Sequence, residues 1–336
     1  LMPGGDKEAF EQIRPIWEAI AAKDFNDQPC TTYVGKSAAG NFVKMVHNGI
    51  EYGIMQGIAE IYDVCSTAGY TNEMIHEVFS QLNAGPLESF LLEITTDIFT
   101  HKDEFQELKI RNQSQDNEGL NPESWLLTPQ EDYLIDNILD RAKSKWTWGW
   151  TVQSAIDLGV PVPTISEALM ARQMSAREWR FVVPEAGELG IVQLQSHDIE
   201  SLRDALTLSY LACYLQWLDL IQAASDEYDW EVDHDEVMRI WQGGCIIRSR
   251  MLESLWDYLE GSNDPLSLDR LMGATEELVS LTPIATPVLQ SSLDYFITIL
   301  RSQLPTNLIQ AQRDYFWAHT FERVDRPRWE TFHHDW

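Results

Sequence analysis

Basic residues are scarce in this sequence. Its 336 residues include 24 lysines and arginines against 53 aspartates and glutamates, which gives a formal net charge of −29 at pH 7. Nucleic-acid backbones and anionic membrane surfaces attract proteins with an excess of positive charge. The composition therefore argues against both kinds of partner.

Cysteines are also few, and they form no recognisable motif. The four of them, at positions 30, 65, 213 and 245, are widely spaced without a C-x-x-C pair, and no signal peptide is recognisable. We therefore expect reduced thiols in a cytoplasmic protein.

Metal-ligand patterns and long apolar runs are lacking as well. His101, His234 and the pair at 333–334 have no recognised ligand spacing to other histidines, acids or cysteines, so we expect no metal site. The apolar segment 211–224 contains Gln216 and Asp219 and is shorter than the roughly 18 residues that a membrane span needs. We expect no membrane span.

Hydrophobic residues, counting tyrosine and tryptophan, make up 44% of the chain, and they recur mostly at helical spacing. The pattern predicts a mainly α protein that can bury a substantial core. The expected helices cover 7–23, 38–67, 71–82, 87–100, 130–141, 152–158, 165–177 and 198–227, and a short strand is expected over 31–34. Residues 102–129, rich in Asn, Gln, Asp and Glu, are interpreted as a surface insertion.

One sequence stretch occurs twice in similar form. Residues 77–85, EVFSQLNAG, resemble residues 236–244, EVMRIWQGG, and each stretch follows a long expected helix. By itself the similarity favours two ordinary amphipathic helices that end at glycine, and an internal duplication is the alternative. In the second stretch we expect Gly243-Gly244 to end one helix and a new helix to begin near Ile246. We assign Cys245 no catalytic role because nothing nearby suggests a lowered thiol pKa.

A polar face on the helix 38–67 is the strongest chemical signal. Lys44, His47, Asn48, Glu51 and Tyr52 stand at i, i+3, i+4, i+7 and i+8, so one surface gathers all five side chains. Apolar residues fill the other directions, which predicts that this face is held inside the protein. Two interpretations follow: a buried polar network, or an acid–base site with the lysine and the glutamate as the proton-transfer pair.

Glycines form a second feature of the same helix. Gly49, Gly53 and Gly57 repeat every four residues, although each costs a helix roughly 1 kcal/mol relative to alanine. We interpret them as a ridge that lets another helix approach closely.

The string KMVHNGIEYGIMQ, residues 44–56, resembles the signature of the 6-phosphogluconate dehydrogenase family. The resemblance implies that Lys44 is the general base and Glu51 the general acid, and that His47, Asn48 and Tyr52 bind substrate. It also implies an all-α domain built from two related multi-helix halves.

Further matches extend the resemblance along the chain. Residues 140–162 follow the family pattern without gaps, and there Lys145 and Thr147 fall on positions that bind the substrate phosphate. Arg172 matches another phosphate-binding arginine, although an arginine near a helix end is by itself most often surface charge. The block NLIQAQRDYFWAHT, residues 307–320, places Arg313 and His319 on family residues that reach the active site of the partner subunit, which implies a homodimer with shared sites.

Tryptophans replace family glycines at three matched positions, Trp146, Trp148 and Trp317. Two indoles in a phosphate loop add bulk where backbone N–H groups would approach an oxyanion. If the indoles point inward they would close the phosphate pocket. We expect them to point outward, because the sequence keeps all four side chains that would bind the phosphate, namely Lys145, Thr147, Arg172 and Arg313.

The resemblance implies NADP-dependent oxidative decarboxylation of 6-phosphogluconate to ribulose 5-phosphate. The coenzyme domain itself, with its G-x-G-x-x-G turn, is missing from this sequence. We interpret residues 1–36 as the end of that coenzyme-binding domain and residues 37–336 as the all-α domain. We infer that the sequence was cut within that domain; the alternative is a gene product that has dispensed with it.

The matched positions differ in charge from the rest of the chain. The matched positions in this acidic chain are rich in cations, namely Lys44, Lys145, Arg172 and Arg313, with two histidines and one acid. Such a cluster suits a small anionic sugar acid, and neighbouring cations would lower the pKa of Lys44. Two alternatives stay open: a coenzyme-free acid–base enzyme, such as a decarboxylase or isomerase acting on another acid, and a non-catalytic dimerisation module.

Overall fold

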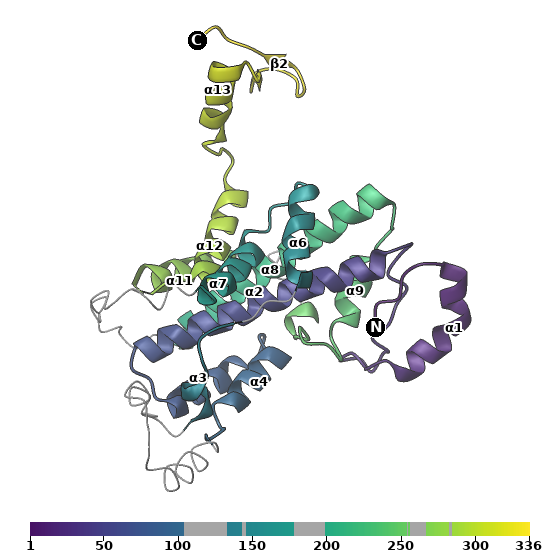
Figure 1. Cartoon of the computed structure of the whole chain (residues 1–336), viewed down its shortest axis with the longest axis vertical. Helices are drawn as coiled ribbons and strands as arrows, with labels where there is room; N and C mark the ends of the chain where they lie inside the picture. The colour runs from purple at the N-terminus through teal and green to yellow at the C-terminus, as the bar shows by residue number, and fades with distance from the viewer. Residues whose placement is uncertain (104–132, 143–145, 178–198, 254, 256–266, 282–283) are drawn as a thin grey trace, which may run out of the picture. The chain divides into compact units, whose positions relative to one another are not determined.

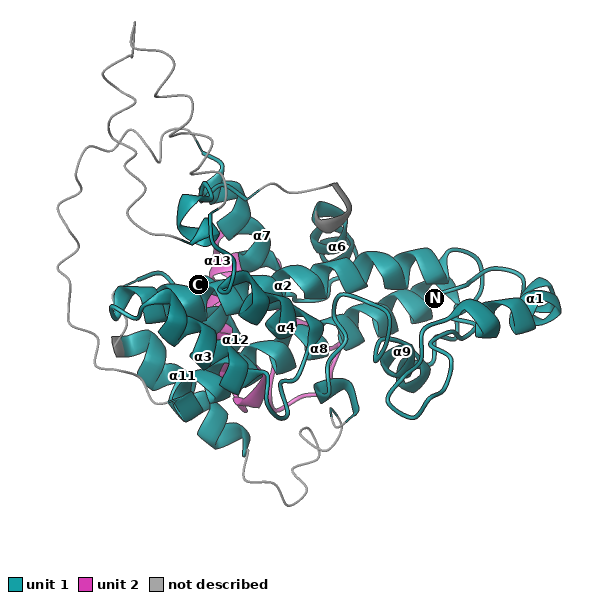
Figure 2. Ribbon diagram, turned by 90° about the horizontal axis from the view of Figure 1, so that it is seen from below, with its two compact units in different colours: residues 1–293 teal, residues 294–336 magenta. Residues whose placement is uncertain are grey.

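The structure is a computed structural model that describes residues 1–103, 133–142, 146–177, 199–253, 255, 267–281 and 284–336 (Figure 1). The chain forms two compact units, Leu1–Leu293 and Asp294–Trp336 (Figure 2). Each unit is described by itself.

The fold is mainly helical, as the sequence pattern predicts. Strands are limited, among the described residues, to a two-residue antiparallel pair near the C-terminus. The elements are α1 (Lys7–Ile20), α2 (Ala39–Thr67), α3 (Asn72–Leu82), α4 (Phe90–Ile98), the 3₁₀ helix η2 (Leu134–Asn137), α6 (Trp146–Asp157), α7 (Pro163–Ser175), α8 (Ile199–Tyr228), α9 (His234–Ile240), α11 (Leu268–Leu281), α12 (Pro287–Leu300), α13 (Thr306–Trp317), β1 (Phe321–Glu322) and β2 (Thr331–Phe332).

Helices α2 and α8 form the centre of unit 1 and pack against each other (Figure 1). The glycine ridge of α2 makes this contact possible, as expected. A Cβ on Gly53 would lie 2.3 Å from Sγ of Cys213, and one on Gly57 would lie 3.0 Å from Oγ of Ser209. The residue numbers of the α8 contacts fall as those of the α2 glycines rise, so the two helices are antiparallel.

The repeated sequence stretch corresponds to a repeated structure. Each long helix is followed by a short one, and both short helices have a side-chain cap: Thr71 accepts from Met74 N–H and Asp233 accepts from Glu236 N–H. The segments that follow meet in an antiparallel bridge between Ser89 and Ser249. The order of a long helix, a short capped helix and a bridged segment thus occurs twice, which is the arrangement that two related halves predict.

The core of unit 1 surrounds α8. Most positions along this helix are buried in every direction, which is typical of a central helix. Large side chains fill the space around it, among them Tyr210, Tyr214, Trp217 and Trp241. Within the described ranges, we find no helix with the length and apolar character needed to cross a bilayer.

The expected strand over 31–34 is not formed. The segment makes one bridge, between Gly4 and Gly35, with Val34 N–H donating to the Pro3 carbonyl over 2.8 Å. Pro3 and Pro29 flank these contacts and have no N–H to extend a ladder. The α1 helix ends at Ile20, three residues earlier than expected.

Helix boundaries differ around the expected insertion. Within 133–142 the structure has only the 3₁₀ helix η2 instead of a helix over 130–141, because Tyr133 pairs with Lys102 and Leu134 N–H donates to the His101 carbonyl. These contacts occupy groups that an α-helix would use. The expected insertion 102–129 lies, beyond its first two residues, outside the described part of the chain.

Two further boundaries depart from expectation. Helix α6 begins at Trp146 instead of 152, because tryptophan in place of glycine favours the helical state. After Gly243-Gly244 the helix resumes at Met251, not near Ile246, since Arg248 and Arg250 bond to the 88–90 segment. Gly243 instead allows a close backbone approach, because a Cβ there would lie 2.0 Å from the Lys23 carbonyl oxygen.

Candidate active site

The polar face of α2 is buried in part. His47 and Tyr52 are 0% and 1% exposed, Asn48 and Glu51 are half-buried, and Lys44 is exposed, with its amine against the buried His47. The expectation of an enclosed face therefore holds for the histidine and the tyrosine and fails for the lysine.

Lys44 and His47 form a hydrogen-bonded pair. The Lys44 Nζ lies 3.2 Å from Nδ1 of His47. A lysine ammonium can only donate, so Nδ1 accepts and the imidazole proton sits on Nε2. Burial lowers the pKa of His47 to about 3, and the Lys44 charge acts in the same direction. His47 is therefore a neutral imidazole near pH 7, and it holds the lysine amine in place.

The surroundings of His47 are apolar on its far side. The ring stands edge-on to Trp241, with centroids 5.4 Å apart, and Nε2 is buried without a hydrogen-bond partner among the described residues. Trp241 was not identified as a site residue from the sequence. The available signal was its place in the stretch 236–244, which resembles residues 77–85.

The pKa of Lys44 is lowered, as expected, but for a different reason. Partial burial of the ammonium lowers it, while Cys245 and Glu51 act in the opposite direction. The neighbouring cations invoked from the sequence are not the main cause. Burial also raises the pKa of Cys245 to about 11, which agrees with its assignment to a structural role.

Lys44 and Glu51 share one electrostatic environment. Seven residues of α-helix separate them, or roughly 10 Å along the axis, and the Glu51 charge acts on both Lys44 and Arg172. A substrate a few carbons long can span such a separation.

Arg172 reaches this face from α7. Its guanidinium carbon lies 3.4 Å from the ring centroid of Tyr52 and Nη2 lies 3.5 Å from Sδ of Met55. Burial lowers the pKa of Arg172, and Tyr52 and Glu51 offset this effect; an arginine nevertheless stays charged. The structure thus brings together residues 120 positions apart, and Arg172 is not mere surface charge.

Buried polar contacts fix α7 in this position. The Gln216 Oε1 accepts from Thr164 N–H over 3.1 Å, and its Nε2 donates to Thr164 Oγ1 over 2.9 Å. Helix α6 is fastened to α2 in a similar way, because Thr151 Oγ1 donates to the Met45 carbonyl over 3.0 Å. A Cβ on Gly49 would lie 2.8 Å from the Thr151 methyl, so this glycine admits α6.

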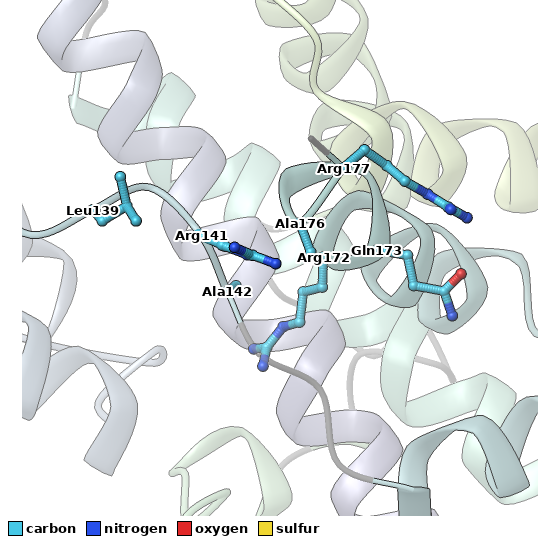
Figure 3. A pocket seen from close by; sticks show the side chains of 7 residues that line it. All are labelled: Leu139, Arg141, Ala142, Arg172, Gln173, Ala176 and Arg177. Atoms are coloured by element: carbon cyan, nitrogen blue, oxygen red, sulfur yellow. The ribbon is translucent and has the colours of Figure 1, made fainter. Parts of the chain in front are cut away.

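A basic cavity of about 740 Å³ adjoins Arg172 (Figure 3). Arg141 and Arg172 point toward the same hollow, whereas Arg177 points away from them. The Ala142 N–H donates to Ser175 Oγ over 3.1 Å and ties the two walls together. Arg141 and Arg177 were not singled out from the sequence. The available signal was that both arginines stand close to matched positions in a chain that is poor in cations. The lining residues are Leu139, Arg141, Ala142, Arg172, Gln173, Ala176 and Arg177.

The remaining phosphate-loop positions are only partly described. Lys145 lies outside the described residues, and Thr147 belongs to the first turn of α6. Trp146 and Trp148 occupy the same turn, so the segment is helical where the family resemblance implies a glycine-rich loop. The direction of these side chains stays a prediction.

Arg313 and His319 belong to unit 2. Arg313 is exposed on α13, and its Nη1 donates to Gln310 Oε1 over 3.2 Å. His319 follows the helix in a turn that begins at Ala318, whose φ is +50°. Trp317 is 75% exposed in the single chain, and its direction relative to the phosphate site stays a prediction.

Comparison with known proteins is consistent along the entire chain. Residues 40–336 match the family model described as 6-phosphogluconate dehydrogenase, C-terminal domain. The decarboxylating 6-phosphogluconate dehydrogenase of Synechocystis is 42% identical, over all of this chain and 69% of the relative. The NADP(+)-dependent, decarboxylating enzyme of Bacillus subtilis is also 42% identical, over all of this chain and 70% of the relative.

A solved structure supports the same relationship. The 6-phosphogluconate dehydrogenase of Plasmodium falciparum, studied in its apo form and with NADP+ or 6-phosphogluconate, superposes with a TM-score of 0.83 at 33% identity. The match covers all of this chain and 70% of that protein. With a family-model match over most of its length and relatives above 40% identity, this chain belongs to the 6-phosphogluconate dehydrogenase family.

Proposed function

We propose that this chain supplies the acid–base and substrate-binding part of an NADP-dependent, decarboxylating 6-phosphogluconate dehydrogenase. The observation that carries the proposal is the meeting of Arg172 from α7 with the α2 face that bears Lys44, His47, Glu51 and Tyr52. A general base, an acid and an anion-binding cation share one region, which is what oxidation and decarboxylation of a phosphorylated sugar acid require.

Lys44 and Glu51 would carry the proton transfers. Partial burial lowers the pKa of Lys44, so a larger fraction is the neutral amine that can accept the proton of the substrate 3-hydroxyl. His47 accepts a hydrogen bond from the amine through Nδ1 and orients it. After loss of carbon dioxide from the β-keto acid, Glu51 would donate a proton to the enediol carbon.

No coenzyme-binding motif is recognisable among the residues described. The sequence has no G-x-G-x-x-G turn, and the described residues form no parallel sheet that could place such a turn before a helix. We therefore assign the hydride-transfer step to no residue of this chain. The interpretation of residues 1–36 as part of a coenzyme-binding domain remains a prediction.

The basic cavity would hold the phosphate end of the substrate. Arg172 and Arg141 point into it, and two arginines can bind a phosphate through bidentate hydrogen bonds. Lys145 and Thr147 would complete the site from α6 and the residue before it. In this arrangement the outward direction of Trp146 and Trp148 is required.

A second copy of the chain would supply Arg313 and His319. Between Arg301 and Trp336 every apolar side chain is at least partly exposed, including Tyr315, Phe316 and Trp317. A 12-residue helix is marginal in water without tertiary packing, so this segment needs a covering surface. We propose a homodimer with shared sites in which the partner provides it.

The cellular location also remains a prediction. The cysteine pattern predicts a cytoplasmic protein. A relative from Arabidopsis that is 40% identical is named as a chloroplastic enzyme, so relatives occur in more than one compartment. Fractionation with a tagged full-length protein would decide between them.

Turnover by a Lys44→Arg variant of the full-length gene product tests the proposal. An arginine keeps the charge but cannot become a neutral base, so kcat should fall by about 100-fold or more. Lys36→Arg is the matched control, because Lys36 is an exposed lysine that pairs with Asp229 and Glu231. Wild-type turnover in the Lys44 variant would exclude the lysine as the base.

Calorimetric titration of the wild-type protein with 6-phosphogluconate and with gluconate tests the phosphate site. We expect clearly tighter binding of the phosphorylated acid. Equal, weak binding would show that phosphate recognition is lost. NADP-independent turnover of another acid would then favour a coenzyme-free acid–base enzyme, and absence of any turnover would favour a dimerisation module.

A further inference from the structure

We propose that Asp314 is a positioning residue that fixes the turn carrying His319 by binding the end of the chain. The inference rests on the proposed substrate-binding role of His319, and its structural part stands on contacts within unit 2.

The Asp314 carboxylate is saturated with hydrogen bonds. Its Oδ1 accepts from Thr320 N–H at 3.0 Å and from His333 Nδ1 at 2.9 Å. Its Oδ2 accepts from His334 N–H at 3.1 Å and from Trp336 Nε1 at 2.9 Å. A carboxylate offers about four acceptor positions, and all are used. We call Asp314 and these four donors the Asp314 cluster.

Burial sets this residue apart from its neighbours. From residue 301 to 336 Asp314 is the one buried side chain, with 0% exposure. A buried, saturated carboxylate cannot contact substrate, so we do not describe it as catalytic. Its donors come from both sides of the β1–β2 hairpin, namely Thr320 before it and the three residues after it.

Helix stability does not explain an acid at this position. Asp314 stands in the last turn of α13, where the helix dipole disfavours negative charge. The compensation comes from the four donors, one of them an imidazole. The site therefore stabilises the segment that follows the helix.

That segment holds His319 in an unusual backbone. Ala318 and Thr320, its two neighbours, have φ values of +50° and +62°, in a region that non-glycine residues rarely adopt. The bond from Thr320 N–H to Asp314 fixes one side of this turn. A turn held in such a conformation persists only when the surrounding contacts over-determine it.

Gln310 connects the same turn to Arg313. Its Nε2 donates to the Thr320 carbonyl at 2.5 Å, and its Oε1 accepts from Arg313 at 3.2 Å. Both proposed substrate-binding residues of unit 2 are thus fastened to one turn. Loss of Asp314 should disturb His319 directly and Arg313 through Gln310.

The charges within the cluster support an ionic contact. The hydrogen bond to Asp314 raises the pKa of His333, and Asp335 adds to this effect from 3.5 Å away. The donors hold the pKa of Asp314 down, at about 2, against the effect of desolvation. The raised pKa of His333 is therefore a measurable signature of the intact cluster.

Asp314→Asn in the full-length protein tests the proposal. The amide keeps one acceptor oxygen but presents an N–H₂ group to two donors, so we expect faster amide exchange at Thr320 and His334 and a lower His333 pKa by NMR. The KM for 6-phosphogluconate should rise about tenfold while kcat changes much less. Asp325→Asn is the matched control, an exposed acid of the same unit that pairs with Arg323.

A second variant covers the case in which Asp314→Asn does not fold. Trp336→Phe removes one donor and keeps an aromatic ring, so a smaller rise in KM and a local increase in exchange at Thr320 are expected. An unchanged KM in both folded variants would overturn the positioning role. If the wild-type protein does not turn over 6-phosphogluconate at all, the proposed function fails, whereas the NMR measurements still decide whether the cluster exists.

Discussion

At the residue scale, the sequence predicted which side chains share a face but not how deeply each is buried. Helical spacing placed Lys44, His47 and Glu51 together, and the structure agrees. The depth of His47 depends on Trp241 and α8, which are distant in sequence. Spacing within one helix contains no information on such partners.

Glu60 gives a prediction about pH at the same scale. This buried residue of α2 accepts hydrogen bonds from the N–H groups of Val288 and Leu289 at 2.9 Å each, at the start of α12. Burial raises its pKa from 4.5 to about 7, against those hydrogen bonds. Between these two pH values the folded protein binds the proton more tightly than the unfolded chain, so stability falls as pH rises, by about 3 kcal/mol in total.

Unfolding by urea at pH 4.5 and pH 7.5 measures this effect. Relative to wild type, Glu60→Gln should lose less stability between the two pH values, because its amide does not titrate. Glu77→Gln, an exposed glutamate on α3, should keep the wild-type pH dependence. Identical pH profiles for all three proteins would mean that Glu60 is ionised in the native state as readily as in the unfolded chain.

At the element scale, the glycine ridge makes a prediction about packing. In Gly53→Ala the new Cβ would lie 2.3 Å from Sγ of Cys213, and overpacking of this kind costs about 1–3 kcal/mol. The gain of about 1 kcal/mol in helix propensity offsets only part of it. Thermal or urea unfolding should therefore show a net loss of stability.

Two companion variants make that measurement specific. Gly273→Ala, in α11 with nothing within 4 Å of the added Cβ, should be stabilising. Adding Cys213→Ala to Gly53→Ala should recover stability, because the second change removes the clashing sulfur. A Gly53→Ala protein as stable as Gly273→Ala would show that α8 can move away at little cost.

Element boundaries show where sequence reasoning reaches its limit. The start of α3 was predicted correctly because Thr71 provides a local cap. The helix expected over 130–141 is not formed in its described part, because Tyr133 and Leu134 use backbone contacts to 101–102. Local signals predict local structure, whereas pairing with a distant segment needs the fold.

The same distinction applies to the candidate site. Arg172 could be assigned from the sequence only through a family resemblance, because its cation–π contact with Tyr52 joins two helices. Arg141 was not found, since its relevance depends on the bond between Ala142 and Ser175. The residues on a single helix were predictable, and those contributed by a second helix were not.

At the scale of the whole molecule, the charge balance accords with the proposed site. A net charge of −29 repels an anionic substrate at long range. The Arg172 cavity, lined by three arginines, is a local exception. The cavity therefore has to attract a small anion against the long-range repulsion, which its arginines can do at short range.

Sharing of active sites between subunits can be tested by mixing two inactive variants, without a structure of the dimer. Lys44→Met and Arg313→Ala should each abolish most activity in the full-length protein, because one removes the proposed base and the other a proposed phosphate-binding residue. If each site combines Lys44 of one subunit with Arg313 of the other, a mixed dimer has one site with both defects and one intact site. Random reassembly of equal amounts forms mixed dimers in about half of the population, so roughly one quarter of wild-type activity should return.

The complementation experiment therefore distinguishes shared from self-contained sites. Unfolding and refolding the two variants together allows the subunits to exchange, and the same treatment of each variant alone is the control. If both residues served the same subunit, every site in a mixed dimer would retain one defect and no activity would return. The exposed aromatic residues Tyr315, Phe316 and Trp317 adjoin Arg313 on α13, so a surface that covers them in a second copy would bring the arginine with it.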